Sequence, residues 1–308
     1  MDLSPQLFTP DAPPLQASPA YAAALGVLGR DALTLSLRAN EQRLGRAQIV
    51  LRNFPALGTV AWLPMGPTWS GAPPHFLKVM ALRHLAKRLP TTGIRLWIST
   101  ASTAEDDSAF AEAGHFVLSA AQSRARLDLL RPIERIRADL SGKWRNSLSR
   151  ADRSHLQIQN DPFPPDSDHW LLREEALLRA ERRYRAWPHA MTLAYAQANP
   201  QACRLFTAQD AGRRLAGMLF LEHEGGVSYH IGWNSPAGRV VCAHQALLWA
   251  AITYYSNRDA HWIDLGVLPK GADGLNRFKL GTGATLVKTG RTWGHTPLTS
   301  TVKALWMR

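Results

Sequence analysis

The stretch KWRNSLSRADR, residues 143–153, lies near the middle of a chain of 308 residues and is the clearest guide to its fold. It falls inside a proline-free segment, 133–154, that predicts one long mid-chain helix. At about 100° per residue, three cations and an amide share an arc of about 80° on this helix: Lys143, Asn146, Arg150 and Arg153. A second arc of similar width is apolar: Leu140, Trp144, Leu148 and Ala151. The apolar stripe can anchor the helix, and the basic stripe either binds a phosphate or carboxylate or simply faces water.

Strands and helices alternate on both sides of this helix. Before it, the hydrophobic pattern predicts strands at 33–37, 48–52, 59–63, 94–99 and 124–129, and helices at 75–88 and 104–112. After it, the pattern predicts strands at 156–159, 203–208, 214–222, 226–232, 261–265 and 285–292, and helices at 168–185, 189–197, 243–256, 271–280 and the C-terminus. The glycine fingerprint of a dinucleotide-binding fold follows none of the strands.

This order predicts an α/β protein with mixed sheets, in which two units of similar size are joined by the mid-chain helix. A Pro-rich segment, 1–17, is expected to be mobile. The N-terminal domain is then expected at 18–130 and the C-terminal domain at 131–308.

Basic residues outnumber acidic ones, with 36 Lys and Arg against 24 Asp and Glu and a net charge of +12. This balance favours contact with phosphates, nucleic acid or an anionic membrane surface. The 2 cysteines and the scattered histidines lack the spacing of a metal site, so no metal is expected. No apolar run reaches the roughly 18 residues of a membrane-spanning helix. We therefore expect a soluble cytoplasmic protein, with the inner face of the membrane as an alternative location.

A second candidate stretch, GLNRFKLGTGA at 274–284, follows the strand expected at 261–265. Gly281 and Gly283 allow the backbone to approach a ligand closely, and Lys279 beside Phe278 can place a positive charge against a ring or a developing oxyanion. The same residues also fit an exposed lysine followed by a plain turn. Taken alone, the stretch does not choose between these interpretations.

Three blocks, in order, resemble the FemABX-like family of aminoacyltransferases. The first is KWRN at 143–146 on the mid-chain helix, with a basic residue at 150. The second runs from the core strand SYHIGW, 228–233, to the helix at 243–249. The third is DLG at 264–266, followed by RFK at 277–279.

This resemblance implies two tandem GNAT-like domains, with an acyl-transfer site in the C-terminal one and no metal or other cofactor. In bridge-forming members of the family, an aminoacyl-tRNA donates an amino acid to an amine on a peptidoglycan precursor. Carried over residue by residue, the resemblance implies that Lys279 and Phe278 steady charge at the reacting carbonyl and that Asp264 shapes the catalytic site. It also implies substrate contacts from a second set of side chains: Lys143, Arg145, Asn146, Arg150, Tyr229, Trp233 and Arg277. The implied partners are charged tRNA and a phosphate-bearing amine acceptor, with no stable protein partner.

The chain departs from this family in two places that bear on the donor. It has no long coiled-coil insertion of the kind that some bridge-forming members use to contact tRNA, and LGTG at 280–283 replaces the second aromatic residue of the family's third block. An acyl-CoA-dependent N-acyltransferase on the same fold is therefore an alternative, although 234–239 matches the GNAT pyrophosphate loop only loosely. A third alternative is a non-catalytic protein that binds nucleic acid or an anionic surface, such as a membrane, through its basic face.

Overall fold

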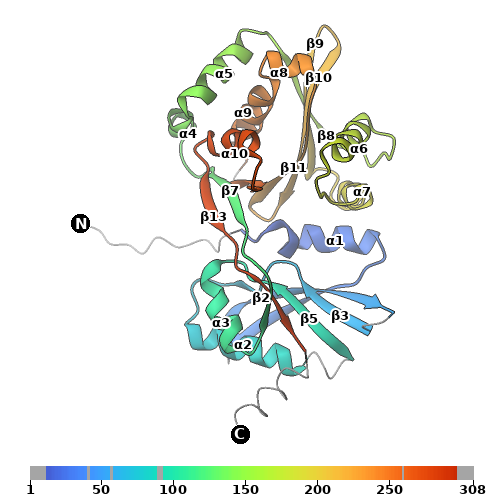
Figure 1. Cartoon of the computed structure of the whole chain (residues 1–308), viewed down its shortest axis with the longest axis vertical. Helices are drawn as coiled ribbons and strands as arrows, with labels where there is room; N and C mark the ends of the chain where they lie inside the picture. The colour runs from blue at the N-terminus through green and yellow to red at the C-terminus, as the bar shows by residue number, and fades with distance from the viewer. Residues whose placement is uncertain (1–11, 40–41, 56–57, 89–92, 259, 297–308) are drawn as a thin grey trace, which may run out of the picture. The chain divides into compact units, whose positions relative to one another are not determined.

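The computed structural model describes residues 12–39, 42–55, 58–88, 93–258 and 260–296, and these residues form two compact units. The described residues of unit 1 lie within 12–18, 30–122 and 288–296, and those of unit 2 lie within 19–29 and 123–287 (Figure 1). This division differs from the contiguous domains 18–130 and 131–308 expected from the sequence, because each unit takes a segment from the other's half of the chain. The helix expected at the C-terminus lies outside the described residues.

Unit 1 is built on one mixed sheet. Its strands are β1 (Ala32–Ala39), β2 (Gln42–Phe54), β3 (Gly58–Leu63), β4 (Thr68–Trp69), β5 (Ile94–Thr100), β6 (Phe116–Ser119) and β14 (Thr292–His295). The strand order is β1-β2-β3-β5-β14-β6, with β4 paired to β2, and only β3 and β5 are parallel neighbours among these pairs. A parallel pair needs a crossover, and α2 (His75–Arg88) supplies it.

The helix α2 has the bounds expected from its periodicity, because Val79, Leu82 and Leu85 recur on one face and are buried there. They pack in a core with Trp97 and with Phe110 of α3 (Asp107–Glu112), which follows a short 3-10 turn, η3 (Ala104–Asp106). Of the N-terminal segment expected to be mobile, the described part includes a 3-10 turn, η1 (Leu15–Ala17), in which two of the three residues are buried.

Unit 2 repeats this architecture with a second mixed sheet. Its strands are β7 (Ser123–Asp128), β8 (Gln157–Pro162), β9 (Cys203–Asp210), β10 (Arg213–His223), β11 (Gly226–Asn234), β12 (Trp262–Val267) and β13 (Thr285–Lys288). The order is β13-β7-β12-β11-β10-β9-β8, and the parallel neighbours β11 and β12 are again joined by a crossover that contains a helix, α9 (Ala243–Ser256). A short helix, α8 (Pro236–Val240), precedes α9.

Helices cover both faces of the unit 2 sheet. The view in Figure 1 places α9 and α10 (Asp273–Leu280) on one side, and α6 (Trp170–Arg182) and α7 (His189–Ala198) on the other. An N-terminal helix that the sequence analysis did not expect, α1 (Pro19–Val27), packs beside α7: Asn199 donates to the Ala20 carbonyl over 3.1 Å. Among the described helices, none combines the length and the apolar character needed to cross a membrane.

Two strands mark the points where the chain passes from one unit to the other. β7 directly follows the segment 30–122 of unit 1 and pairs with β12 of unit 2. β14 follows the segment 123–287 of unit 2 and pairs with β5 of unit 1. The single strand expected at 285–292 is therefore two strands, β13 and β14, that belong to different sheets. A hydrophobic pattern cannot show this division, because it reports which residues are buried and not against which sheet.

The long helix expected from 133 to 154 is wrong. The segment forms two helices, α4 (Ile133–Asp139) and α5 (Gly142–Asp152), because Leu140 adopts an extended ψ of 134°. Ser141 then begins α5: its hydroxyl accepts a hydrogen bond from the Trp144 backbone amide, and its own amide donates to the Gly281 carbonyl over 2.9 Å. The segment is therefore broken into two helices, because the Ser141 hydroxyl caps α5 and the Ser141 amide bonds to the distant Gly281.

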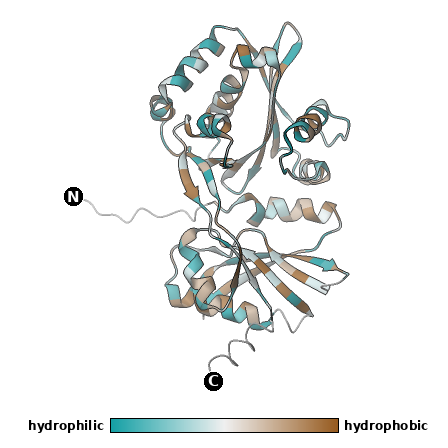
Figure 2. Ribbon diagram, in the orientation of Figure 1, coloured by the Kyte–Doolittle hydropathy of each residue, from teal (hydrophilic) through white to brown (hydrophobic). Residues whose placement is uncertain are grey.

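The two stripes expected on this segment are present on α5 except at their ends, since Leu140 precedes the helix and Arg153 directly follows it. Trp144, Leu148 and Ala151 are buried, whereas the stripe of Lys143, Asn146, Arg150 and Arg153 is exposed. Figure 2 shows the ribbon of α5 as mostly hydrophilic, which suits a helix that buries one narrow face.

The serine cap provides a direct test of the break. We expect Ser141→Ala to lower the free energy of unfolding by about 1 kcal/mol, because the first turn of α5 loses the acceptor for its Trp144 amide. Ser149→Ala, at an exposed position inside the same helix, is the control and should be neutral or slightly stabilising. Urea denaturation of the two variants measures the difference; equal midpoints would show that the cap does not hold the break.

Candidate active site

The strands β11 and β12 pair at one end and separate at the other. Their parallel ladder runs from Gly226↔Trp262 to Ser228↔Asp264 and stops there, although both strands continue, to Asn234 and Val267. In unit 1 the corresponding ladder between β3 and β5 extends through Leu63↔Ser99, the last residue of β3. Separated strand ends in the middle of a sheet leave backbone groups free to bind a ligand, so unit 2 holds the better candidate site.

A β-bulge at His230 changes which face of the sheet the side chains in the separated part of β11 point to. Leu219 of β10 lies opposite Ile231 and Phe220 lies opposite Tyr229, so His230 is the extra residue. The Tyr229 ring packs against Phe220 at a centroid distance of 5.6 Å, within the core that α9 covers. Trp233 instead lies 5.6 Å from Trp170 of α6. Tyr229 and Trp233, both expected to contact substrate, thus pack against opposite faces of the sheet.

Lys279 is a buried cation beside the end of β12. It lies on α10 with only 5% of its surface exposed, and its Nζ donates to the Val267 carbonyl over 2.8 Å. Burial lowers the pKa of Lys279 to about 8, with the Asp264 carboxylate opposing the shift and Arg124 adding to it. Gly266, at φ 87°, leaves the space beside Nζ open: a Cβ there would lie 3.5 Å from it.

Asp264 is held by an arginine that the sequence analysis did not select. Both Nε and one terminal nitrogen of Arg124 on β7 contact Asp264 Oδ2, at 2.8 and 2.7 Å, and Oδ1 accepts from the Gly266 amide at 2.7 Å. The alternation in SRARLD, 123–128, does place Arg124 on the polar face of a strand. Nothing in the sequence indicates that this strand pairs with β12, because Arg124 and Asp264 are 140 residues apart along the chain.

Phe278 and the glycines after it join α10 to the corner between α4 and α5. The Trp144 indole nitrogen donates to the Phe278 carbonyl over 3.1 Å, and the two rings lie 6.2 Å apart. A Cβ on Gly281 would lie 2.7 Å from the Arg277 carbonyl and 3.0 Å from the Trp144 ring. The close approach that these glycines allow is therefore to the protein's own helices. The alternative of an exposed lysine is wrong, because Lys279 is buried.

The predicted binding residues fall into separate groups. Lys143, Asn146 and Arg150 share the exposed face of α5, and Arg277 is exposed on α10. Arg145 instead donates to the Ala138 carbonyl at the end of α4, over 2.9 Å. The structure brings Lys279 and Asp264 together at the end of β12 and ties Phe278 to α5 through Trp144.

The histidine near the separated strands is held by the backbone. His244 Nε2 lies 2.8 Å from the Trp233 carbonyl, and burial lowers the pKa of His244 to about 4. It is therefore a neutral hydrogen-bond donor at physiological pH. Within the ranges that the structure describes, no group of 3 or more His, Cys, Asp or Glu side chains is placed to hold a metal ion.

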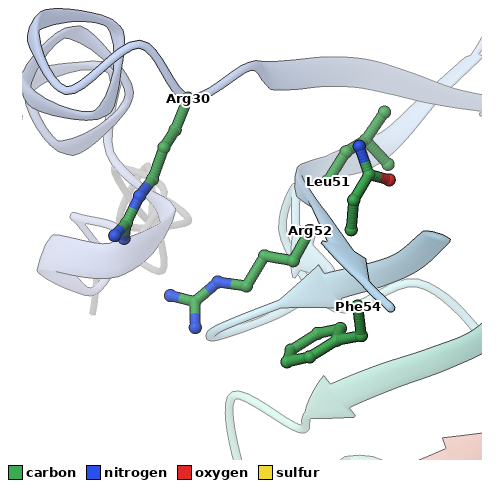
Figure 3. Close-up of a pocket in the computed structure, with 5 residues that line it drawn as sticks. Arg30, Leu51, Arg52 and Phe54 are labelled. Atoms are coloured by element: carbon green, nitrogen blue, oxygen red, sulfur yellow. The ribbon is translucent and has the colours of Figure 1, made fainter. Parts of the chain in front are cut away.

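Unit 1 has a hollow of about 310 Å³ that carries two guanidinium groups. It is lined by Arg30, Leu51, Arg52, Asn53 and Phe54, and the side chains of Arg30 and Arg52 reach toward the same space (Figure 3). The Arg52 guanidinium lies 4.5 Å from the Trp62 ring, and its buried Nε has no hydrogen-bond partner in the described part of the chain. The hollow suits an anionic group.

Comparison with known proteins identifies the fold. No family model and no curated protein sequence matches the chain. Among solved structures, the chain is similar to FemX, with a TM-score of 0.77, 11% identity and coverage of 96% of this chain and 95% of FemX.

Two further structures resemble the chain over most of its length. One is the C-terminal domain of a putative lysylphosphatidylglycerol synthetase from Agrobacterium fabrum, with a TM-score of 0.58, 14% identity and coverage of 94% and 91%. The other is a tandem GNAT protein from the clavulanic acid biosynthesis pathway, with a TM-score of 0.50, 11% identity and coverage of 87% and 83%. The chain therefore has the tandem GNAT-like fold of FemX, and the FemABX resemblance is confirmed at the level of the fold.

The contact between Gly281 and α5 gives a matched pair of substitutions. We expect Gly281→Ala to lower the free energy of unfolding by about 1–3 kcal/mol, because the new methyl would overlap the Arg277 carbonyl and press on Trp144. Gly274→Ala, on the same helix with open space around its Cβ, should be neutral or stabilising. Denaturation midpoints measure both; equal effects would contradict the close packing at Gly281.

The buried Lys279 makes stability depend on pH. In the unfolded chain this lysine keeps its ordinary pKa of 10.5, and in the folded protein its pKa is about 8, so the unfolded state binds more protons between these values. Stability contributed by Lys279 therefore rises with pH in this window. From about pH 7 to about pH 9, the free energy of unfolding of the wild type should rise by about 1 kcal/mol relative to that of Lys279→Met. A constant difference would show that Lys279 is not buried as a cation.

Proposed function

We propose that this protein is an acyltransferase that forms an amide bond in unit 2, with an aminoacyl-tRNA as the donor. The observation that carries the proposal is the separation of β11 from β12 beside the buried cation Lys279. Backbone groups of the separated strands can bind the acyl chain in an extended form. The Lys279 ammonium, which uses one hydrogen bond on the Val267 carbonyl, keeps donors for an oxyanion.

The chemistry needs an amine and a carbonyl held together, and stabilisation of the charge that develops on the carbonyl oxygen. Lys279 supplies the positive charge in a site where water is scarce, so its effect is stronger than at the surface. Asp264, fixed by Arg124 and the Gly266 amide, holds the end of β12 in place and limits the loss of charge from Lys279. Phe278 fixes α10 through Trp144.

The exposed cations of α5 support a nucleic-acid donor. Lys143, Arg150 and Arg153 lie on one face of a helix whose opposite face is tied to α10, so tRNA phosphates bound there would sit on the element next to Lys279. The fold is shared with a lysylphosphatidylglycerol synthetase domain, whose name states an aminoacyl product. The hollow of Arg30 and Arg52 in unit 1 is by itself a candidate site for an anionic group. We place this reaction in the cytoplasm, with the inner face of the membrane as the alternative.

An acyl-CoA donor is the second candidate, because the fold is shared with a tandem GNAT protein whose structure is described as being without AcCoA. The α8 helix begins at Pro236, shortly after β11. Its N-cap residue is Ser235, whose hydroxyl accepts a hydrogen bond from the Gly238 amide. That side chain occupies an amide of the helix start that a pyrophosphate would otherwise contact. We therefore favour aminoacyl-tRNA.

The test is a filter-retention assay with charged tRNA, followed by addition of a pool of cellular amines. We expect retention of the labelled tRNA and amine-dependent loss of its aminoacyl group, with about 100-fold slower loss in Lys279→Met and unchanged loss in Lys270→Met, an exposed lysine on a turn. Consumption of an acyl-CoA thioester by the same pool, without tRNA retention, would move the assignment to the second candidate.

A protein that only binds nucleic acid or an anionic surface would behave differently. It would consume no donor, and its salt-sensitive binding would survive Lys279→Met. Charge reversal at Arg150 and Arg153 on the exposed face of α5 would abolish that binding. This combination would replace the transferase proposal with the binding alternative.

A further inference from the structure

Helix α2 of unit 1 presents two large apolar side chains to solvent. Phe76 and Met80 are each 61% exposed, and they are one helical turn apart, so they are neighbours on the helix surface. The helix packs on the core of unit 1 through other residues, among them Val79, Leu82 and Leu85. A single exposed apolar residue is common on protein surfaces, but adjoining ones form a patch of the kind that marks interaction sites.

The chain that leads into α2 is also exposed and has no charge. Between β4 and α2 it reads SGAPP, 70–74, and four of these five residues are exposed: Ser70, Gly71, Ala72 and Pro74. Phe76 then lies in the first turn of the helix. The two apolar side chains therefore follow a segment that offers no charge of its own.

The other end of α2 is basic. At about 100° per residue, Phe76, Met80, Arg83 and Lys87 fall within an arc of about 60°, so one exposed stripe changes along the helix from apolar to cationic. The helix as a whole contains four Lys or Arg and no acidic residue. This stripe is complementary to a surface that carries negative charge above an apolar layer.

The carboxylates that contact α2 are paired with earlier positions of the helix. Asp106 lies 2.8 Å from the Lys78 ammonium. Glu112 of α3 lies 2.9 Å from His75 Nε2 and 3.9 Å from the Arg83 guanidinium, which also donates to the Glu112 carbonyl over 2.9 Å. Lys87 is exposed one turn further along the helix than either carboxylate's partners. The stripe therefore ends in a cation that faces solvent.

The chemistry of the stripe favours a lipid surface over other anionic partners. Nucleic acid is bound chiefly through its phosphates, to which Phe76 and Met80 offer no donor. A stable protein interface buries about 800 Å² on each partner, far more than two side chains supply. A bilayer needs only shallow insertion of apolar side chains, together with attraction between cations and anionic headgroups.

We propose that α2 docks the protein on the surface of a bilayer that contains anionic lipids. Phe76 and Met80 enter the boundary between headgroups and acyl chains, and Arg83 and Lys87 contact the anionic headgroups. The helix lies along the bilayer surface, and its opposite face stays in the core of unit 1. This docking surface lies within unit 1 and does not depend on the reaction proposed for unit 2.

The test is flotation of the full chain with two kinds of vesicle, one of phosphatidylcholine alone and one that also contains the anionic lipid phosphatidylglycerol. We expect binding to the anionic vesicles, which weakens as NaCl is raised from about 50 mM to about 500 mM because salt screens the attraction. The double variant Phe76→Gln, Met80→Gln should bind about 10-fold more weakly, because the insertion of apolar groups is lost. Lys87→Glu should bind about 10-fold more weakly and with a smaller dependence on salt.

Helix α6 provides matched controls. Leu177 is a leucine with 68% of its surface exposed, and Arg182 is an exposed cation in the last turn, as Lys87 is in α2. Leu177→Gln and Arg182→Glu should keep wild-type binding to vesicles. Glutamine is compatible with a helix, so the α2 double variant should keep the wild-type denaturation midpoint, which separates lost docking from lost folding.

Equal weakening in the α2 and α6 variants would overturn the proposal, because it would show diffuse attraction of a basic protein to the vesicles. Equal binding to both kinds of vesicle would also overturn it. Absence of vesicle binding, with a dimer that the α2 double variant dissociates, would assign this face to a second copy of the chain. The assay contains no acyl donor, so each of these failures leaves the transferase proposal standing.

Discussion

The contact between the α4–α5 corner and the end of α10 is the constraint on which the candidate site depends. Two hydrogen bonds make it, from the Ser141 amide to the Gly281 carbonyl and from the Trp144 indole to the Phe278 carbonyl. Both need the chain to turn at Leu140, and both need a residue without a side chain at position 281. The corner therefore exists because α10 docks there, and the exposed cations of α5 are fixed relative to Lys279 as a result.

Among the described residues of unit 2, charged side chains are buried at three places, and each is matched by a specific partner. Lys279 has the Val267 carbonyl, Asp264 has Arg124, and Glu175 of α6 has a tyrosine hydroxyl and a histidine imidazole. Such pairs contribute little net stability compared with apolar packing, because removing charges from water costs nearly as much as their attraction returns. These charges act through their electric fields, which stay strong because little water is present to screen them. We infer that unit 2 gives up stability to hold the charges of Lys279 and Asp264 at the end of β12, where the strands separate.

The two units share one order of elements but differ at their parallel strands. Each sheet begins with an antiparallel meander, and a crossover containing a helix connects the last strand of the meander to a parallel neighbour. The strand next to this neighbour is antiparallel to it and comes from a distant part of the chain: β14 beside β5 and β7 beside β12. The ladder β3–β5 stays closed, and β11–β12 opens after Ser228. The same architecture thus serves as scaffold in unit 1 and as candidate active site in unit 2. The exchange of β7 and β14 makes neither unit a contiguous segment.

The sequence by itself determined what depends on short-range order. The periodicity of α2 and α9, the two stripes of α5 and the resemblance blocks around Lys143 and Lys279 are local patterns. The structure has α2 and α9 with the expected bounds, and α5 as one part of the segment expected to be a single helix. Burial against any partner produces the same pattern, so periodicity finds an element without saying what it packs on.

Only the tertiary structure decided the features that join distant segments. The break at Ser141 depends on Gly281, the partner of Asp264 is Arg124 at a separation of 140 residues, and Glu175 meets a histidine from the next helix. The assignment of β14 to unit 1 and of α1 to unit 2 has the same origin. Each is a choice among partners that are equivalent in the sequence, and the free energy of packing the whole chain makes that choice.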